Sequence, residues 1–150
     1  MKPDENLVLA DAASRFATVI APQVQPAYLA AAIGMYGGLL GMIAEDWDRS
    51  ASRRVEENRA IRALFRDAAG LELELEPGLA ARLAGLAAGN DEDLRLSALE
   101  AGNEALRAAL IDLHAAVEAM DGAPAKALND AIWAELSAST ERRRLSAGSF

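Results

Sequence analysis

The only histidine in the chain is the first residue whose type suggests chemistry. His114 is followed one helical turn later by Glu118, and an imidazole and a carboxylate at this spacing share one face of a helix. Both groups can bind a transition metal. The residue three before His114 is Ile111, so the Glu-x-x-His pattern of di-iron bundles is missing. His114 and Glu118 are therefore candidate ligands of a mononuclear metal site, and the alternative is an exposed pair on a charged helix face.

A second candidate site comes from large side chains in an otherwise small-residue stretch. They could line a pocket for a small molecule, with acidic residues of two predicted helices nearby. The alternative is ordinary core packing, which is the commoner use of such residues at helical spacing. The candidate ligand-binding residues are Met35, Tyr36, Met42 and Trp47.

Other kinds of site are excluded by what the sequence lacks. The chain has no cysteine, which removes disulfides, thiolate nucleophiles and zinc sites with sulfur ligands. It has no Gly-x-Ser-x-Gly nucleophile motif and no phosphate-binding Gly-x-x-x-x-Gly-Lys-Ser/Thr loop. The sequence therefore identifies no catalytic residue and implies no cofactor, and whether the protein is an enzyme stays open.

Charge narrows the choice of partner and location. The formal net charge is −8, and its acidic excess opposes the approach of a phosphate backbone, so we expect no nucleic-acid binding. The first residues carry acids where a signal peptide would have a basic region and an apolar block. We therefore expect a cytoplasmic protein.

Composition predicts an all-α fold. Hydrophobic residues make up 52% of the chain, but alanine supplies many of them and aromatic residues only 5%, which favours helices over strands. At 150 residues the expected organisation is a single helical-bundle domain, 1–150. We predict about five helices: a first at about 4–21, one long central helix (26–69), a short one near 79–89, and a long helical pair (91–120, 124–145).

The first half of the predicted central helix has no charged residue from Ala27 to Ala44. Its weak hydrophobicity and acidic C-terminal flank argue against a membrane span. A helix of this length would extend about 65 Å, so it must bend, break near Gly41, or be covered by a partner. Small residues at helical spacing allow close helix approach, which predicts a homodimer, or another protein partner, with interface glycines Gly34, Gly37, Gly38 and Gly41.

Two patterns predict how the remaining helices pack. Apolar residues seven apart form a seam at Leu99, Leu106, Leu113 and Met120, with small residues between them. The segments 58–65 and 103–110 share Asn, Ala, Arg and Ala at equal positions. If this similarity is structural, Asn58 and Asn103 face each other inside the bundle; the alternative is a chance match with two partly exposed amides.

The predicted ion pairs are local. Six arginines between Arg49 and Arg66 are balanced by six acids between Glu45 and Asp67, which is typical of a solvated, ion-paired helix face. The run Arg142–Arg144 is expected at a solvated helix C-terminus, where positive charge is favourable.

Together these features favour a non-catalytic interaction or accessory protein that associates with itself through the glycine-rich helix. The alternative is a helical-bundle enzyme or small-molecule-binding protein with its pocket near Tyr36 and Trp47, with or without a metal.

Overall fold

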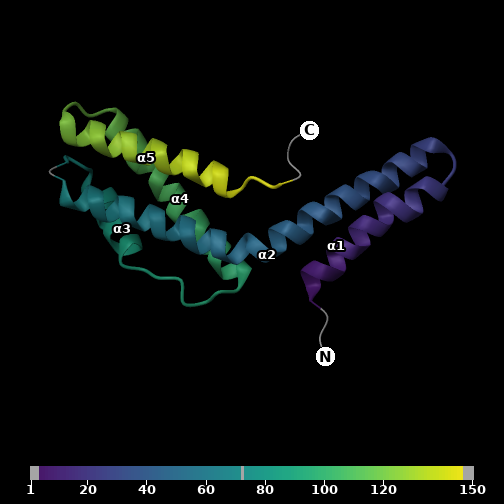
Figure 1. Ribbon diagram of the computed structural model, residues 1–150. Helices are drawn as coiled ribbons and strands as arrows, with labels where there is room; N and C mark the ends of the chain where they lie inside the picture. Colours follow the sequence, from purple (N-terminus) through teal and green to yellow (C-terminus); the bar gives the residue numbers. More distant parts are fainter. Residues whose placement is uncertain (1–3, 72, 147–150) are drawn as a thin grey trace. The chain divides into compact units, whose positions relative to one another are not determined.

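The computed structural model describes residues 4–71 and 73–146 of the chain. The protein is all-α, as predicted, with five α-helices joined by short connections (Figure 1). A π-helical turn at Phe16–Ile20 and a 3₁₀ turn at Ala21–Gln23 follow the first helix. The helices are α1 (Glu5–Arg15), α2 (Ala27–Gly70), α3 (Pro77–Ala87), α4 (Leu96–Glu118) and α5 (Ala123–Arg142).

The contacts within the chain divide it into two compact units. The first unit comprises residues 1–50 with 145–150, and the second comprises residues 51–144. The boundary falls inside α2, which is one uninterrupted helix and does not break at Gly41. The prediction of a single domain stays a prediction, and the two units are described one at a time.

The first unit is a helical hairpin in which α1 runs alongside the first half of α2 (Figure 1). The closest approach is at Gly37, where a Cβ would lie 2.9 Å from the carbonyl oxygen of Ala13 and 3.1 Å from the backbone nitrogen of Ala17. Only glycine permits this distance between the two backbones. The apolar residues that this hairpin buries are all small: Ala13, Ala21 and Ala44.

Two neighbouring glycines give a matched test of this contact. Gly37→Ala is expected to destabilise the hairpin by about 1–3 kcal/mol, because α1 must move away from the added methyl group. Gly38→Ala is expected to stabilise it by about 0.5–1 kcal/mol through helix propensity, since a Cβ at Gly38 meets nothing within 4 Å in the described chain. Hydrogen exchange of the α1 amides measures both effects. Equal protection in the two variants would contradict the contact.

The second unit contains the hydrophobic core. Its centre is made by α2, α4 and α5, with α3 and the side chains of Leu71, Leu73 and Leu75 packed against them. The predicted seam of α4 is confirmed, because Leu99, Leu106 and Leu113 are fully buried and Met120 packs at the edge of the core. The other fully buried large apolar side chains are Ile61, Phe65, Val117 and Ile132.

The predicted start of the fourth helix is wrong. The helix begins at Leu96 and not at Asp91, and its N-cap Arg95 makes no side-chain capping bond. The acids of the preceding segment bind elsewhere: Asp91 accepts hydrogen bonds from Arg62, and Asp93 accepts one from the Arg95 backbone N–H. The α4 helix also ends at Glu118, short of the predicted 120, and α5 ends at Arg142, short of 145.

Candidate functional site

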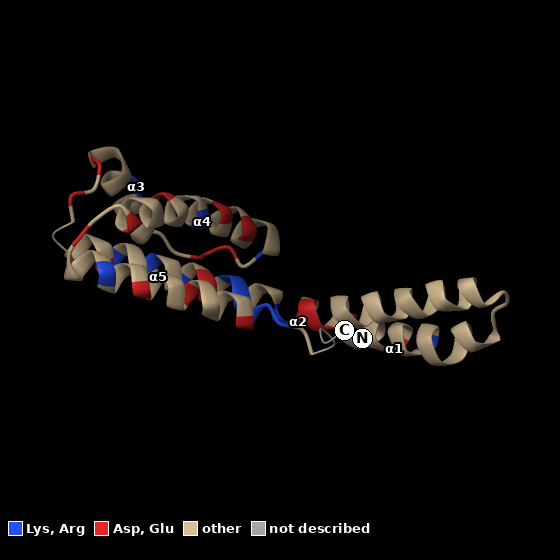
Figure 2. Cartoon of the chain, turned by 90° about the horizontal axis from the view of Figure 1, so that it is seen from above, with Lys and Arg blue, Asp and Glu red and all other residues tan. Residues whose placement is uncertain are grey.

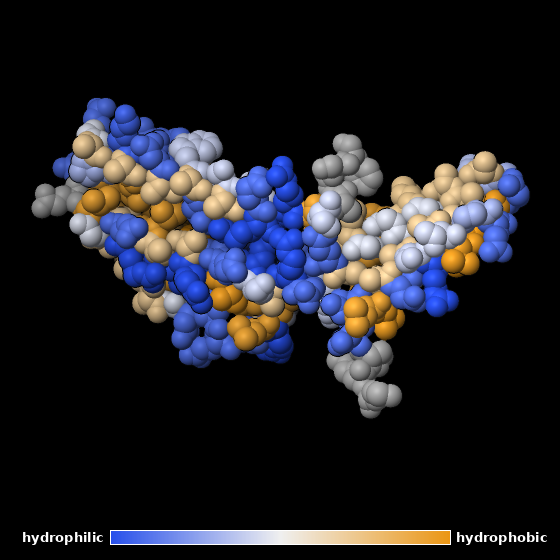
Figure 3. Space-filling model, in the orientation of Figure 1, coloured by the Kyte–Doolittle hydropathy of each residue, from blue (hydrophilic) through white to orange (hydrophobic). Residues whose placement is uncertain are grey.

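The most unusual surface of the protein is an apolar stripe on the first half of α2. At about 100° per residue, its members fall within one third of the helix circumference. This face lies opposite Gly37 and Gly41, which meet Ala13 of α1, and opposite the buried Ala44. Figure 3 shows hydrophobic side chains at the surface of this hairpin. The apolar stripe consists of Tyr28, Leu29, Met35, Tyr36, Leu39, Ile43 and Trp47, all exposed.

The stripe has almost no charge around it. No charged residue occurs between Phe16 and Ala44, and the hairpin accordingly shows few coloured residues in Figure 2. Three acids, Glu45, Asp46 and Asp48, mark the end of the stripe next to Trp47. The exposed apolar face is therefore not broken by side chains that would favour water.

The candidate ligand-binding residues all lie on or beside this stripe. Met35, Tyr36 and Trp47 are between 57% and 60% exposed, and Met42 is half-buried at the edge of the stripe. They therefore form an open surface more than a closed cavity. Their role in binding a small molecule stays a prediction.

The candidate interface glycines divide into two pairs. Gly37 and Gly41 face α1, with the Cβ position of Gly41 3.8 Å from the Cβ of Ala13. A Cβ at Gly34 or Gly38 would meet no atom of the described chain within 4 Å. One pair thus packs within the chain, and the other pair has open space where a side chain would begin.

The α2 helix is also long and apolar enough to cross a membrane. Its most apolar 18-residue window has a mean hydropathy of 1.6, and only 11% of that window is buried. Low burial separates this segment from the core helix of an ordinary globular domain. It does not separate a membrane segment from a protein interface, because both need an exposed apolar face.

His114 lies against α5, and the expectation of an exposed surface pair is wrong for it. Its side chain is 16% exposed, its Nε2 lies 2.9 Å from Asn129 Oδ1 and 3.4 Å from Glu118 Oε1, and its ring meets the edge of Trp133 at 5.1 Å. Among residues 4–71 and 73–146, no three His, Asp or Glu side chains lie close enough together to hold a metal ion. The His114 and Glu118 pair thus has no third ligand of these types.

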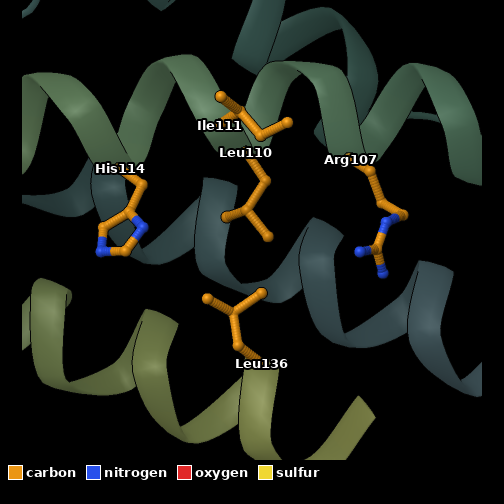
Figure 4. Close-up of a pocket in the computed structure, with 5 residues that line it drawn as sticks. All are labelled: Arg107, Leu110, Ile111, His114 and Leu136. Atoms are coloured by element: carbon orange, nitrogen blue, oxygen red, sulfur yellow. The ribbon is translucent and has the colours of Figure 1, made fainter. Parts of the chain in front are cut away.

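A small cavity lies between α4 and α5 beside His114. It has a volume of about 70 Å³, and Figure 4 shows Leu110 and Leu136 pointing towards each other across it. Its other lining residues are Arg107, Ile111 and His114. This volume is too small for any ligand beyond a few water molecules.

A buried carboxylate organises the polar interior of the second unit. Glu57 is 1% exposed and accepts hydrogen bonds from Ser139 Oγ at 2.9 Å and from Arg143 Nη2 at 2.9 and 2.8 Å to its two oxygens. Arg107 donates to it as well, and Arg54 Nη1 lies 3.7 Å away. We call Glu57, Arg107, Ser139 and Arg143 the Glu57 cluster.

The Glu57 cluster suits structure more than catalysis. Burial raises the pKa of Glu57, but the hydrogen bonds from Arg143 and Ser139, the charge of Arg143 and the hydrogen bond from Arg107 together hold it below its ordinary value. Oε1 of Glu57 accepts three hydrogen bonds, from Arg107, Ser139 and Arg143, and Oε2 accepts one from Arg143. A general base needs a pKa near neutrality, so Glu57, whose pKa is lowered, is a poor candidate for proton transfer.

Of the two alternatives for Asn58 and Asn103, the structure shows the first, in which the two amides meet inside the bundle. Asn103 Nδ2 donates to Asn58 Oδ1 at 2.9 Å, and both residues are buried. Asn58 Nδ2 in turn donates to Asp91 Oδ1 at 3.0 Å. The two amides therefore join α2 to α4, whereas a common origin of their two segments stays untested.

Some arginines that were expected on solvated helix faces pair with acids of other segments. Arg49 pairs with Glu45 on its own helix, but Arg54 pairs with Glu100 of α4 and Arg62 pairs with Asp91. At the end of α5, Arg143 turns back to Glu57 and does not extend into solvent. The arginines of α2 thus hold separate segments together.

A comparison of the chain with protein-family models, curated proteins and solved structures finds no match.

Proposed function

We propose that the protein is a non-catalytic, cytoplasmic interaction protein that forms a homodimer through the apolar stripe of its hairpin. The observation that carries this proposal is the exposure of seven large apolar side chains on one face of α2. Water contact with so many apolar groups is unfavourable, and burial against a matching surface removes it.

The area of the stripe supports a stable protein interface. Its seven side chains together expose on the order of 800 Å², which is the share of one partner in a standard interface. A typical monomer has a largest apolar patch of roughly 300–600 Å². The stripe is thus larger than scattered surface hydrophobics explain.

The poor core of the hairpin is the reason to choose a second copy of the chain. Its buried apolar residues are three alanines, too little buried surface to hold about fifty residues together. A second hairpin would supply large side chains of the same kind, and the uncharged stretch from Ala27 to Ala44 would keep charged residues away from all of the contact except its Trp47 end.

Two-fold symmetry places the stripe on itself. In an antiparallel isologous pair, the stripe from Tyr28 to Trp47 would have its centre between Tyr36 and Leu39. A substitution near this centre is present in both copies of the chain, so the two altered side chains would lie close together at the symmetry axis.

Leu39→Glu is therefore expected to abolish the dimer. Two carboxylates would be buried near the symmetry axis, so the dissociation constant should rise at least 100-fold, about 3 kcal/mol. Sedimentation equilibrium at micromolar concentration should give twice the 15.8 kDa chain mass for the wild type and 15.8 kDa for the variant.

The matched control is Leu94→Glu, because Leu94 is also an exposed leucine but lies outside the hairpin. It should leave the dimer intact. A wild type that sediments at the mass of one chain contradicts the proposal. A wild type that is monomeric and floats with phospholipid vesicles would instead assign the stripe to a membrane.

A further inference from the structure

A hollow in the second unit has a different chemical character from the apolar stripe. It lies between the second half of α2 and the segment that precedes α4, and its volume is about 230 Å³. Residues at the spacing of one helix face supply one wall, and the segment after α3 supplies the other. The lining residues are Val55, Arg59, Arg62, Arg66, Gly89, Asn90 and Asp91.

Positive charge exceeds negative charge in this hollow. Three arginines meet a single carboxylate, Asp91, which is already fully engaged. Arg62 Nη1 and Nη2 donate to its two oxygens at 2.8 and 2.9 Å, and Asn58 Nδ2 donates at 3.0 Å. The hollow is therefore basic within a protein whose net charge is −8.

Several donors in the hollow have no acceptor. Arg62 is nine-tenths buried, and its Nε–H has no hydrogen-bond acceptor among the residues that the structure describes. A buried donor in this condition is unfavourable and favours a ligand that accepts from it. The Cβ position of Gly89 is 3.9 Å from this Nε, so Gly89 lies next to the unpaired donor.

The two other arginines of the hollow, Arg59 and Arg66, have more unused hydrogen-bond donors than Arg62. Arg59 makes no hydrogen bond within the described part of the chain. The pKa of Asp91 is lowered mainly by the hydrogen bonds and charge of Arg62, and the charge of Arg59 makes a smaller contribution. Arg66 uses Nη1 alone, in a bond of 3.3 Å to the carbonyl oxygen of Ala87. Both guanidinium groups can thus offer paired N–H donors to an anion.

We propose that this hollow binds a small molecule through a phosphate group. Guanidinium groups present N–H donors in a planar fork that matches the oxygens of phosphate, and three of them can surround one such group. The volume is several times that of a water molecule, which occupies about 30 Å³ in the liquid, so a phosphate with an attached organic group or a diphosphate fits. The site is independent of the proposed dimer interface, because none of its residues belongs to the hairpin.

The test is calorimetric titration of the full chain with pyrophosphate, inorganic phosphate and ribose 5-phosphate at low ionic strength. Pyrophosphate or ribose 5-phosphate should bind with measurable heat and more tightly than inorganic phosphate. Arg59→Gln and Arg66→Gln should each weaken binding roughly 10-fold or more, because each removes a charge-assisted donor. Circular dichroism should show that both variants keep their helices.

The matched control is Arg82→Gln, because Arg82 is an exposed arginine paired with Asp112 away from the hollow. It should bind the three anions like the wild type. A silent titration with all three anions overturns the proposal. An equal loss of affinity in the Arg82 variant does so as well, since it would show attraction to positive charge in general.

Discussion

Glu57→Ala is expected to lower the free energy of unfolding by about 2–3 kcal/mol, because it removes a buried carboxylate and leaves its hydrogen-bond donors without their acceptor. The variant leaves Arg107 and Arg143 facing each other without the carboxylate that both contact. It also leaves Ser139 Oγ without its acceptor. The three donors come from α4 and α5, so the loss should loosen the whole second unit.

Urea denaturation followed by circular dichroism measures this effect. The control is Glu141→Ala, because Glu141 pairs with Arg144 on an exposed helix end and should cost under about 1 kcal/mol. Glu57→Gln keeps the shape and some hydrogen bonds and should fall between the two. If Glu57→Ala costs no more than Glu141→Ala, the Glu57 cluster does not stabilise the fold.

The same carboxylate should influence stability in acid. The pKa of Glu57 is held below its ordinary 4.5, so its stabilisation is present above that pH and is lost as the pH falls through the lowered value. Hydrogen bonds from Arg62 lower the pKa of Asp91 below 3.8, with the same sign. Burial raises the pKa of Glu135 and acts in the opposite direction. The wild type should therefore lose stability more steeply below about pH 4.5 than Glu57→Gln does.

The second large effect is expected at the paired amides. Asn58→Leu or Asn103→Leu alone should cost about 2–3 kcal/mol, because each leaves a buried amide or carboxylate without its partner. Asn58 is the more costly of the two, since it also donates to Asp91 and, at 3.5 Å, to the carbonyl oxygen of Leu99. The two substitutions together should cost less than their sum by about 1–3 kcal/mol, because the double variant leaves no unpaired amide between α2 and α4.

Equilibrium unfolding of the two single variants and the double variant completes this cycle. Asn129→Leu is a suitable comparison, because Asn129 bonds His114 and does not contact the amide pair. Its effect should add to that of Asn103→Leu without coupling. Strict additivity between Asn58 and Asn103 would contradict a direct role for their hydrogen bond.

Much of the helical framework could be predicted from periodicity. The composition and the seven-residue spacing of Leu99, Leu106 and Leu113 determine an all-α protein with a buried α4 seam, because these side chains can leave water only on one helix face. The repeated Asn-x-x-x-Arg spacing placed Asn58 and Asn103 at equal positions of their two helices, but it left open whether they meet. These features depend on intervals along one helix, which the sequence states directly.

Other features depend on which segments meet in space, and only the tertiary structure decides them. Asp91 has the signature of a helix N-terminus, but Arg62 binds it across the fold and α4 begins at Leu96. Gly37 and Gly38 are equivalent in local sequence, yet only Gly37 meets α1. An acid, an arginine or a glycine offers the same local preference wherever it occurs. The partner of each such residue depends on how helices distant in the sequence pack together. The spacing of residues along one helix does not predict that packing.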